Sequence, residues 1–76
     1  MKRKIYVNDG SLYQVNELKS LILLCPQTND YHILEAGSIM LALAPSKNFS
    51  NAWLCHYQEK MYYAYGIDIY LLCTKL

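Results

Sequence analysis

The chain has 76 residues, of which 54% are hydrophobic and 17% are charged, and its formal net charge is +1. This length leaves room for one hydrophobic core and therefore predicts a single domain over residues 1–76. The apolar content excludes an intrinsically disordered chain. The near-neutral charge lacks the strong basic bias of most nucleic-acid-binding domains and protects little against self-association, so a homodimer is one possible state.

Cysteine use and hydropathy indicate where the protein works. Cys25, Cys55 and Cys73 are widely spaced and form no CxxC pair. The basic start, MKRKIYVNDG, is interrupted before an apolar core of secretory length develops. No apolar run approaches the roughly 20 residues that a membrane-spanning helix needs. These features predict free thiols, a cytoplasmic location and no membrane partner.

The chain is expected to begin with a β-hairpin. Residues 4–7 and 12–15 are rich in residues that favour extended backbone. The sequence between them, Asn8-Asp9-Gly10, is a strong turn signal because these residue types tolerate positive φ. A hairpin over residues 4–15 follows from this pattern.

The next third of the chain leaves two alternatives open. Residues 17–25 are rich in leucine and slightly favour a short helix, although the apolar run before Pro26 fits a buried strand equally well. Residues 31–35 and 38–44 fit two strands around an Ala-Gly turn, with a helix over 38–44 as the competing interpretation. The polar segments 26–30 and 45–51 are expected to be loops.

Residues 51–65 are predicted to form the principal helix. Ser50 is a suitable N-cap, and Gly66 stands where a C-terminal glycine is common. The alternative is a pair of strands joined at residues 58–60, but that turn would lack Gly, Asn, Asp and Pro. At helical spacing, one face would collect Trp53, Leu54, Tyr57, Met61, Ala64 and Tyr65.

Residues 67–73 alternate in a way that favours a buried strand, with Ile67, Ile69 and Leu71 on one side and Asp68 on the other. Together these elements predict an α+β fold in which helix 51–65 packs on a small antiparallel sheet. A mainly-β barrel or sandwich is the alternative, given the eight tyrosines.

The sequence carries no pattern typical of catalysis or metal binding. Cys55-His56 is the only adjacent pair of potential ligands, and zinc sites normally use pairs at CxxC or HxxxH spacing. The carboxylates are scattered, and there is no phosphate-binding loop or serine elbow. We therefore expect no enzyme activity, no metal and no cofactor.

The expected helix 51–65 suggests one contact surface. Opposite its apolar face lie His56, Glu59, Tyr62 and Tyr63, with Lys60 at the boundary. Exposed tyrosines beside ionisable groups are typical of protein-binding hot spots. These five residues are the predicted partner-binding site.

The leading functional hypothesis is a small non-enzymatic interaction domain that docks on a larger protein or protein complex and regulates or inhibits it. Compact chains of this kind are common among regulators encoded by phages and mobile elements, anti-CRISPR proteins among them, which is an association and not a resemblance. The alternative is a nucleic-acid-binding accessory protein that uses Lys2, Arg3, Lys4 and surface tyrosines.

Overall fold

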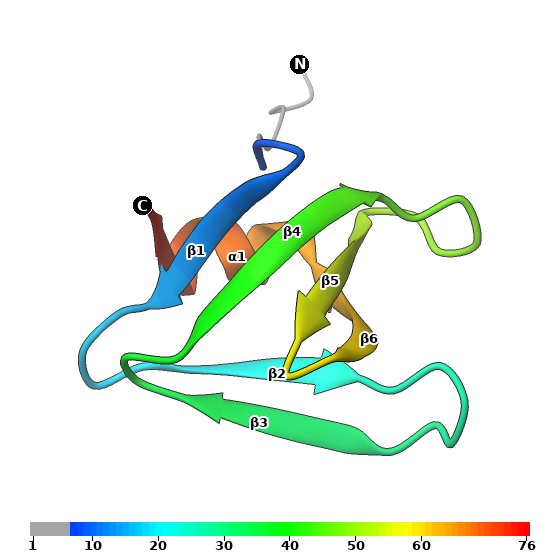
Figure 1. Cartoon of the computed structure of the whole chain (residues 1–76), viewed down its shortest axis with the longest axis horizontal. Helices are drawn as coiled ribbons and strands as arrows, with labels where there is room; N and C mark the ends of the chain where they lie inside the picture. The colour runs from blue at the N-terminus through cyan, green and yellow to red at the C-terminus, as the bar shows by residue number, and fades with distance from the viewer. Residues whose placement is uncertain (1–6) are drawn as a thin grey trace.

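The computed structural model describes residues 7–76, and within this range the chain forms seven strands and one short helix (Figure 1). All strand pairs are antiparallel, and the single sheet has the order β3-β2-β6-β5-β4-β1-β7 without closing into a barrel. The elements are β1 (Ser11–Val15), β2 (Ser20–Leu24), β3 (Tyr31–Glu35), β4 (Ile39–Pro45), β5 (Ala52–Tyr57), β6 (Lys60–Tyr65), α1 (Gly66–Leu72) and β7 (Cys73–Lys75).

The broad expectation of a small antiparallel sheet accompanied by a helix is confirmed, but the helix is minor and lies elsewhere. Residues 52–65 form a hairpin of β5 and β6 in six consecutive residue pairs, so the predicted principal helix over 51–65 is wrong. Gln58 and Glu59 make the turn with φ of 48° and 66°. Two-residue hairpin turns need positive φ, which costs a non-glycine residue about 1–3 kcal/mol. Pairing of β5 with β4 and of β6 with β2 offsets this cost.

The predicted strand over residues 67–73 is also wrong, because Gly66–Leu72 is the helix α1. Gly66 begins this helix and its N–H donates to the Asn51 carbonyl over 2.7 Å. A Cβ atom on Gly66 would lie 2.8 Å from the Trp53 ring, so only glycine fits between the helix and β5 without a shift. The Trp53 ring is itself held by a 3.1 Å hydrogen bond from its Nε1 to the Asp9 carboxylate.

The helix favoured slightly for residues 17–25 is wrong, since Ser20–Leu24 is a strand. Tyr31–Glu35 is the strand β3 and Ile39–Pro45 is the strand β4, so the interpretation of residues 31–35 and 38–44 as two strands is confirmed, with β4 beginning and ending one residue later. These strands do not pair with each other. β3 pairs with β2, and β4 lies between β1 and β5. The segments between β2 and β3 and between β4 and β5 are loops, as expected.

The expected hairpin over residues 4–15 is tested only in its second half. The turn at Asp9-Gly10 is present, with Gly10 at φ 73°, and Ser11–Val15 is the strand β1. Both sides of β1 are occupied by β4 and β7. Residues 4–6 of the expected first strand lie outside the described residues.

The sheet is strongly curved, so that one of its faces encloses a core. In Figure 1, β2 and β3 lie below β1 and β4 and run at an angle to them, and α1 lies behind β1 and β4. Except for Ala52, the buried hydrophobic side chains form one cluster with members from every element: Val7, Tyr13, Val15, Leu21, Leu23, Leu34, Met40, Ala42, Cys55, Tyr62, Ala64, Ile69 and Cys73. The other face of the sheet is turned outward. Over residues 7–76, no helix is long and apolar enough to cross a membrane.

Candidate functional site

The five residues predicted as a partner-binding surface all lie on the β5–β6 hairpin, but they do not share a face. Successive side chains of a strand point to opposite sides of the sheet. Tyr62 therefore points toward the core with Cys55, its partner in the β5–β6 pairing. Tyr63 and His56 point outward, while Glu59 lies in the turn and Lys60 follows it, both exposed.

Tyr62 is only 7% exposed, so the expectation that it forms a surface with Tyr63 is wrong. Its ring stacks on the His32 ring with centroids 5.6 Å apart. The same imidazole lies 5.9 Å from the Tyr57 ring. Tyr62 thus joins the core to the inner side of β3.

Tyr63 is half-buried and packs on the outer face. Its ring meets the Phe49 ring edge to face, with centroids 5.0 Å apart. Phe49 belongs to the β4–β5 loop, so this contact holds the loop against β6. Tyr63 also opposes Leu24, which is the only residue pair that joins β6 to β2.

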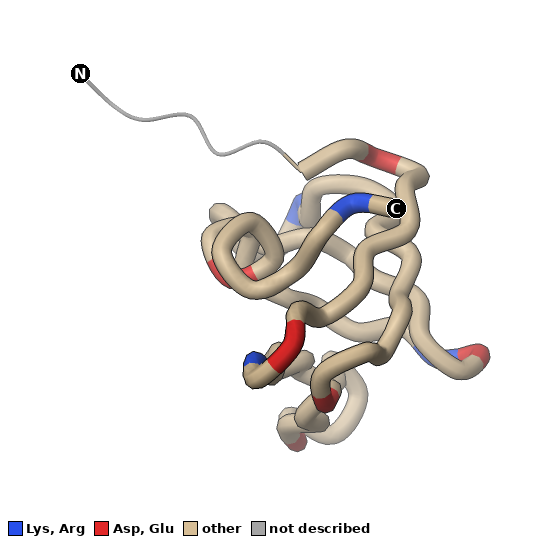
Figure 2. Tube along the Cα trace, turned by 90° about the vertical axis from the view of Figure 1, so that its left-hand side faces the viewer, with Lys and Arg blue, Asp and Glu red and all other residues tan. Residues whose placement is uncertain are grey.

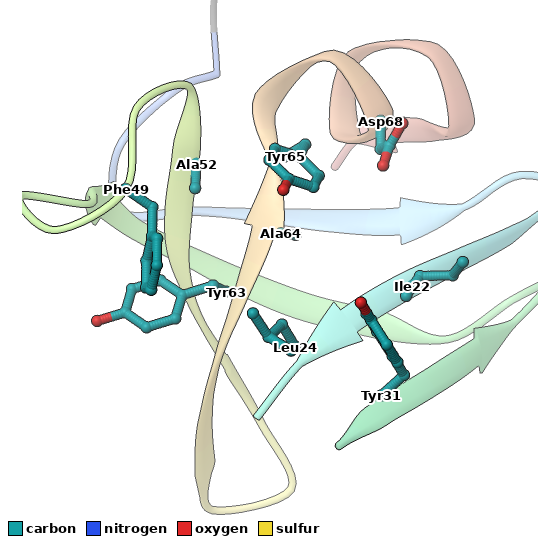
Figure 3. Close-up of a pocket in the computed structure, with 9 residues that line it drawn as sticks. All are labelled: Ile22, Leu24, Tyr31, Phe49, Ala52, Tyr63, Ala64, Tyr65 and Asp68. Carbon is teal, nitrogen blue, oxygen red and sulfur yellow. The ribbon is translucent and has the colours of Figure 1, made fainter. Parts of the chain in front are cut away.

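Beside this contact the sheet opens into a groove. β2 and β6 share a single residue pair, and beyond it the chain of β6 turns into α1 and diverges from β2. Figure 3 shows the resulting hollow, with β2 and β3 on one side and β6 and the start of α1 on the other. The groove has a volume of about 230 Å³, and its lining consists of Ile22, Leu24, Tyr31, Phe49, Ala52, Tyr63, Ala64, Tyr65 and Asp68.

The groove is lined by apolar side chains and one charged group. Eight of its nine lining residues are aliphatic, aromatic or alanine, and the Asp68 carboxylate is the exception. Pockets that enclose a small-molecule ligand or cofactor have volumes of about 300–1,000 Å³, which exceeds the volume here. A single aliphatic or aromatic side chain of a partner is a better match in size. The exposed Ile22, Tyr31 and Tyr65 form the rim on which such a partner would rest.

The sequence did not predict this groove, because the segments of β2 and β6 were expected to be helices. A signal was nevertheless present in the sequence. The run LILL is apolar at four successive positions, and YHIL at three of four, whereas a strand with one solvated face alternates between apolar and polar residues. Ile22 and Ile33 stand opposite each other on the outer face, and both are exposed. Apolar residues on both faces of β2 and β3 indicate a second surface to be covered.

Charged residues are scattered over the described part of the molecule, as Figure 2 shows. Lys19, Lys47, Lys60 and Lys75 lie on four different elements or loops, with acidic residues among them. Nucleic-acid binding usually needs several clustered cations. The alternative hypothesis therefore depends on Lys2, Arg3 and Lys4, which lie outside the described residues.

The three cysteines are free, and they differ in environment. Burial raises the pKa of the Cys55 thiol to about 12 and that of the Cys73 thiol to about 11. Hydrogen bonding by the Thr28 side chain, followed by the backbone of Gln27 and Thr28, lowers the pKa of the Cys25 thiol. Among residues 7–76, no group of three or more His, Cys, Asp or Glu residues is placed to hold a metal ion.

These environments predict selective alkylation. In the folded protein at pH 8, iodoacetamide is expected to modify Cys25 rapidly, and Cys55 and Cys73 at least about 100-fold more slowly than after unfolding, because each unit of raised pKa lowers the thiolate fraction about tenfold. Mass spectrometry of timed samples measures the three rates, with Cys25→Ser as the control. Equal rates for all three thiols in the folded chain would contradict the buried positions.

Comparison with known proteins adds no assignment: no protein-family model, curated protein or solved structure matches this chain.

Proposed function

We propose that this chain is a non-enzymatic protein-interaction domain, active in the cytoplasm, that regulates or inhibits a larger protein. It does so by fitting the groove between β2 and β6 over an apolar side chain of that partner. The observation that carries the proposal is the exposed apolar rim of the groove. Contiguous exposed apolar surface on a small domain is typical of interaction sites.

The composition of the groove supports this function. Tyr31, Tyr63 and Tyr65 supply three aromatic rings around it. Tyrosine is enriched at binding hot spots because its ring buries a large area and its hydroxyl still forms hydrogen bonds. The Asp68 carboxylate at the wall favours a partner segment with a lysine or arginine next to the apolar side chain.

Two tyrosines of similar exposure allow a matched test. Tyr65 lines the groove and is 60% exposed, whereas Tyr70 on α1 is 55% exposed and does not line it. Tyr65→Ala is expected to reduce partner binding about 30-fold or more, the usual effect of a hot-spot residue, without lowering the melting temperature. Tyr70→Ala is expected to bind like the wild type.

The measurement is affinity capture from host lysate with quantitative mass spectrometry, run in parallel with wild type, Tyr65→Ala, Tyr70→Ala and Ile22→Ala from the opposite wall. A true partner is retained by wild type and Tyr70→Ala and lost with the other two. Its affinity is then measured with purified components. Equal capture by all four proteins, or a greater loss with Tyr70→Ala, would exclude the groove as the binding site.

A further inference from the structure

The edge strand β3 differs from the edge strand at the other end of the sheet. Natural sheets protect their edges with short strands, lysine, proline or bulges, because a free edge pairs readily with another strand. β7 has only three residues and carries Lys75. β3 has five residues, contains neither lysine nor proline, and pairs in unbroken register with β2 alone among the described strands. β3 is thus the unprotected edge.

The backbone groups that point to this edge follow from one hydrogen bond. The Cys25 N–H donates to the Asp30 carbonyl over 2.8 Å, one residue pair beyond the Leu24–Tyr31 pair. Hydrogen-bonded and non-hydrogen-bonded pairs alternate along an antiparallel ladder. Counting from that bond, β3 uses His32 and Leu34 to bond β2. The backbone N–H and C=O groups of Tyr31, Ile33 and Glu35 therefore lie on the side of the free edge, where the Glu35 carbonyl already accepts a hydrogen bond from the Ser38 N–H over 3.1 Å.

These three positions are self-complementary. If a second β3 lies antiparallel around a two-fold axis at Ile33, Ile33 faces its own copy and Tyr31 faces Glu35 of the other chain. All three residues then occupy positions of hydrogen-bonded pairs, in which the Glu35 carbonyl accepts a second bond besides the one from Ser38. A two-fold axis at His32 or Leu34 would pair only two of them, and a shift by one residue would place inner-face side chains opposite outer-face ones.

The side chains favour the same register. Ile33 is exposed, and direct apposition of two copies removes apolar surface from water. The Tyr31 hydroxyl can donate to the Glu35 carboxylate opposite it. The two Glu35 residues would be separated by about 13 Å along the strands, at a rise of about 3.3 Å per residue, which exceeds the screening length of about 8 Å. A net charge of +1 adds little repulsion between two copies.

We propose that two copies of this chain associate through β3, in an antiparallel pair centred on Ile33, to form one continuous sheet across a two-fold axis. The axis is perpendicular to the sheet, so the outer faces of both copies turn to the same side. The dimer therefore presents both grooves in one direction, which suits a partner with two copies of the recognised segment. This proposal does not depend on the groove being a binding site.

The first test measures the mass of the wild type by analytical ultracentrifugation over a range of concentrations. We expect a concentration-dependent dimer. Ile33→Lys places like charges directly opposite each other and is expected to raise the dimer dissociation constant at least tenfold. Leu12→Lys is the matched control, because Leu12 is 48% exposed and Ile33 60%, and it lies on β1. Leu12→Lys is expected to dimerise like wild type.

A cross-link tests the geometry itself. Opposed residues of a hydrogen-bonded pair have Cα atoms about 5.5 Å apart, which is within the range of about 4.4–6.8 Å that a disulfide spans. In a Cys25→Ser background, Ile33→Cys is expected to give a covalent dimer on mild oxidation, much faster than Leu12→Cys. A wild type that stays monomeric up to about 1 mM, or equal cross-linking of the two variants, would overturn the proposal. Cross-linking by Leu12→Cys alone would overturn it too.

Discussion

Tyr62→Ala is expected to lower the free energy of unfolding by about 3–5 kcal/mol, the range for removing a buried aromatic side chain. The Tyr62 ring lies in the core cluster and stacks on His32, so its loss leaves a cavity between β6 and β3. A domain of this size has a total stability of only about 4–11 kcal/mol. The milder Tyr62→Phe keeps the ring and is expected to cost less than about 1.5 kcal/mol.

The neighbouring tyrosine provides the control. Tyr63 is half-buried on the outer face and contacts Phe49, so Tyr63→Ala is expected to cost at least about 2 kcal/mol less than Tyr62→Ala. Urea unfolding followed by circular dichroism measures all three variants. Similar losses for Tyr62→Ala and Tyr63→Ala would contradict their positions on opposite faces of β6, and would favour the helix that the sequence suggested.

Ile69→Ala is expected to destabilise the protein by about 2–5 kcal/mol, whereas Ile67→Ala should cost less than about 1 kcal/mol. Ile69 is fully buried, and Ile67 is 43% exposed. In a strand these two residues would share a face and respond alike. In a seven-residue helix, positions two apart point about 200° from each other, which separates them.

The same pair of variants therefore distinguishes helix from strand in residues 66–72. Denaturant unfolding gives both free energies, and the fluorescence of Trp53, the only tryptophan, reports on the packing beside Gly66. Equal losses for Ile67→Ala and Ile69→Ala would exclude α1. A larger loss of unfolding free energy for Ile67→Ala than for Ile69→Ala would mean that Ile67 is the buried residue of the two, which would contradict the structure.

Several features could be predicted from the sequence because they depend on neighbouring residues. The turn at Asp9-Gly10 and the loop around Pro26 come from residues whose own φ preferences break regular structure. The strands β1, β3 and β4 follow from short apolar runs of extended type. Length and composition predicted one apolar core, and the predicted elements together gave the broad class of an antiparallel sheet with a helix.

The exchange of helix and strand in the last third of the chain could not be predicted in this way. Residues 52–65 have apolar side chains at both helical and alternating spacing, and no glycine or asparagine marks the turn at Gln58 and Glu59. The strand form is stabilised by pairing with β4, across the loop that precedes β5, and with β2, which is far away in the sequence. Helical periodicity gives no information about such partners.

The partner-binding surface predicted from the sequence is wrong for the same reason, because it assumed a helix where the chain forms a hairpin. His56, Glu59, Tyr62 and Tyr63 share a side of a helix, but as members of a hairpin they divide between the core, the outer face and the turn. The groove exists only because β2 and β6 separate after one residue pair. Length and residue types alone were enough to predict one small core, the turn at Asp9-Gly10 and the excess of apolar residues in the segments of β2 and β3. Which of those residues come into contact became known from the three-dimensional structure, because strand pairing joins segments whose contact produces no periodic pattern in either segment.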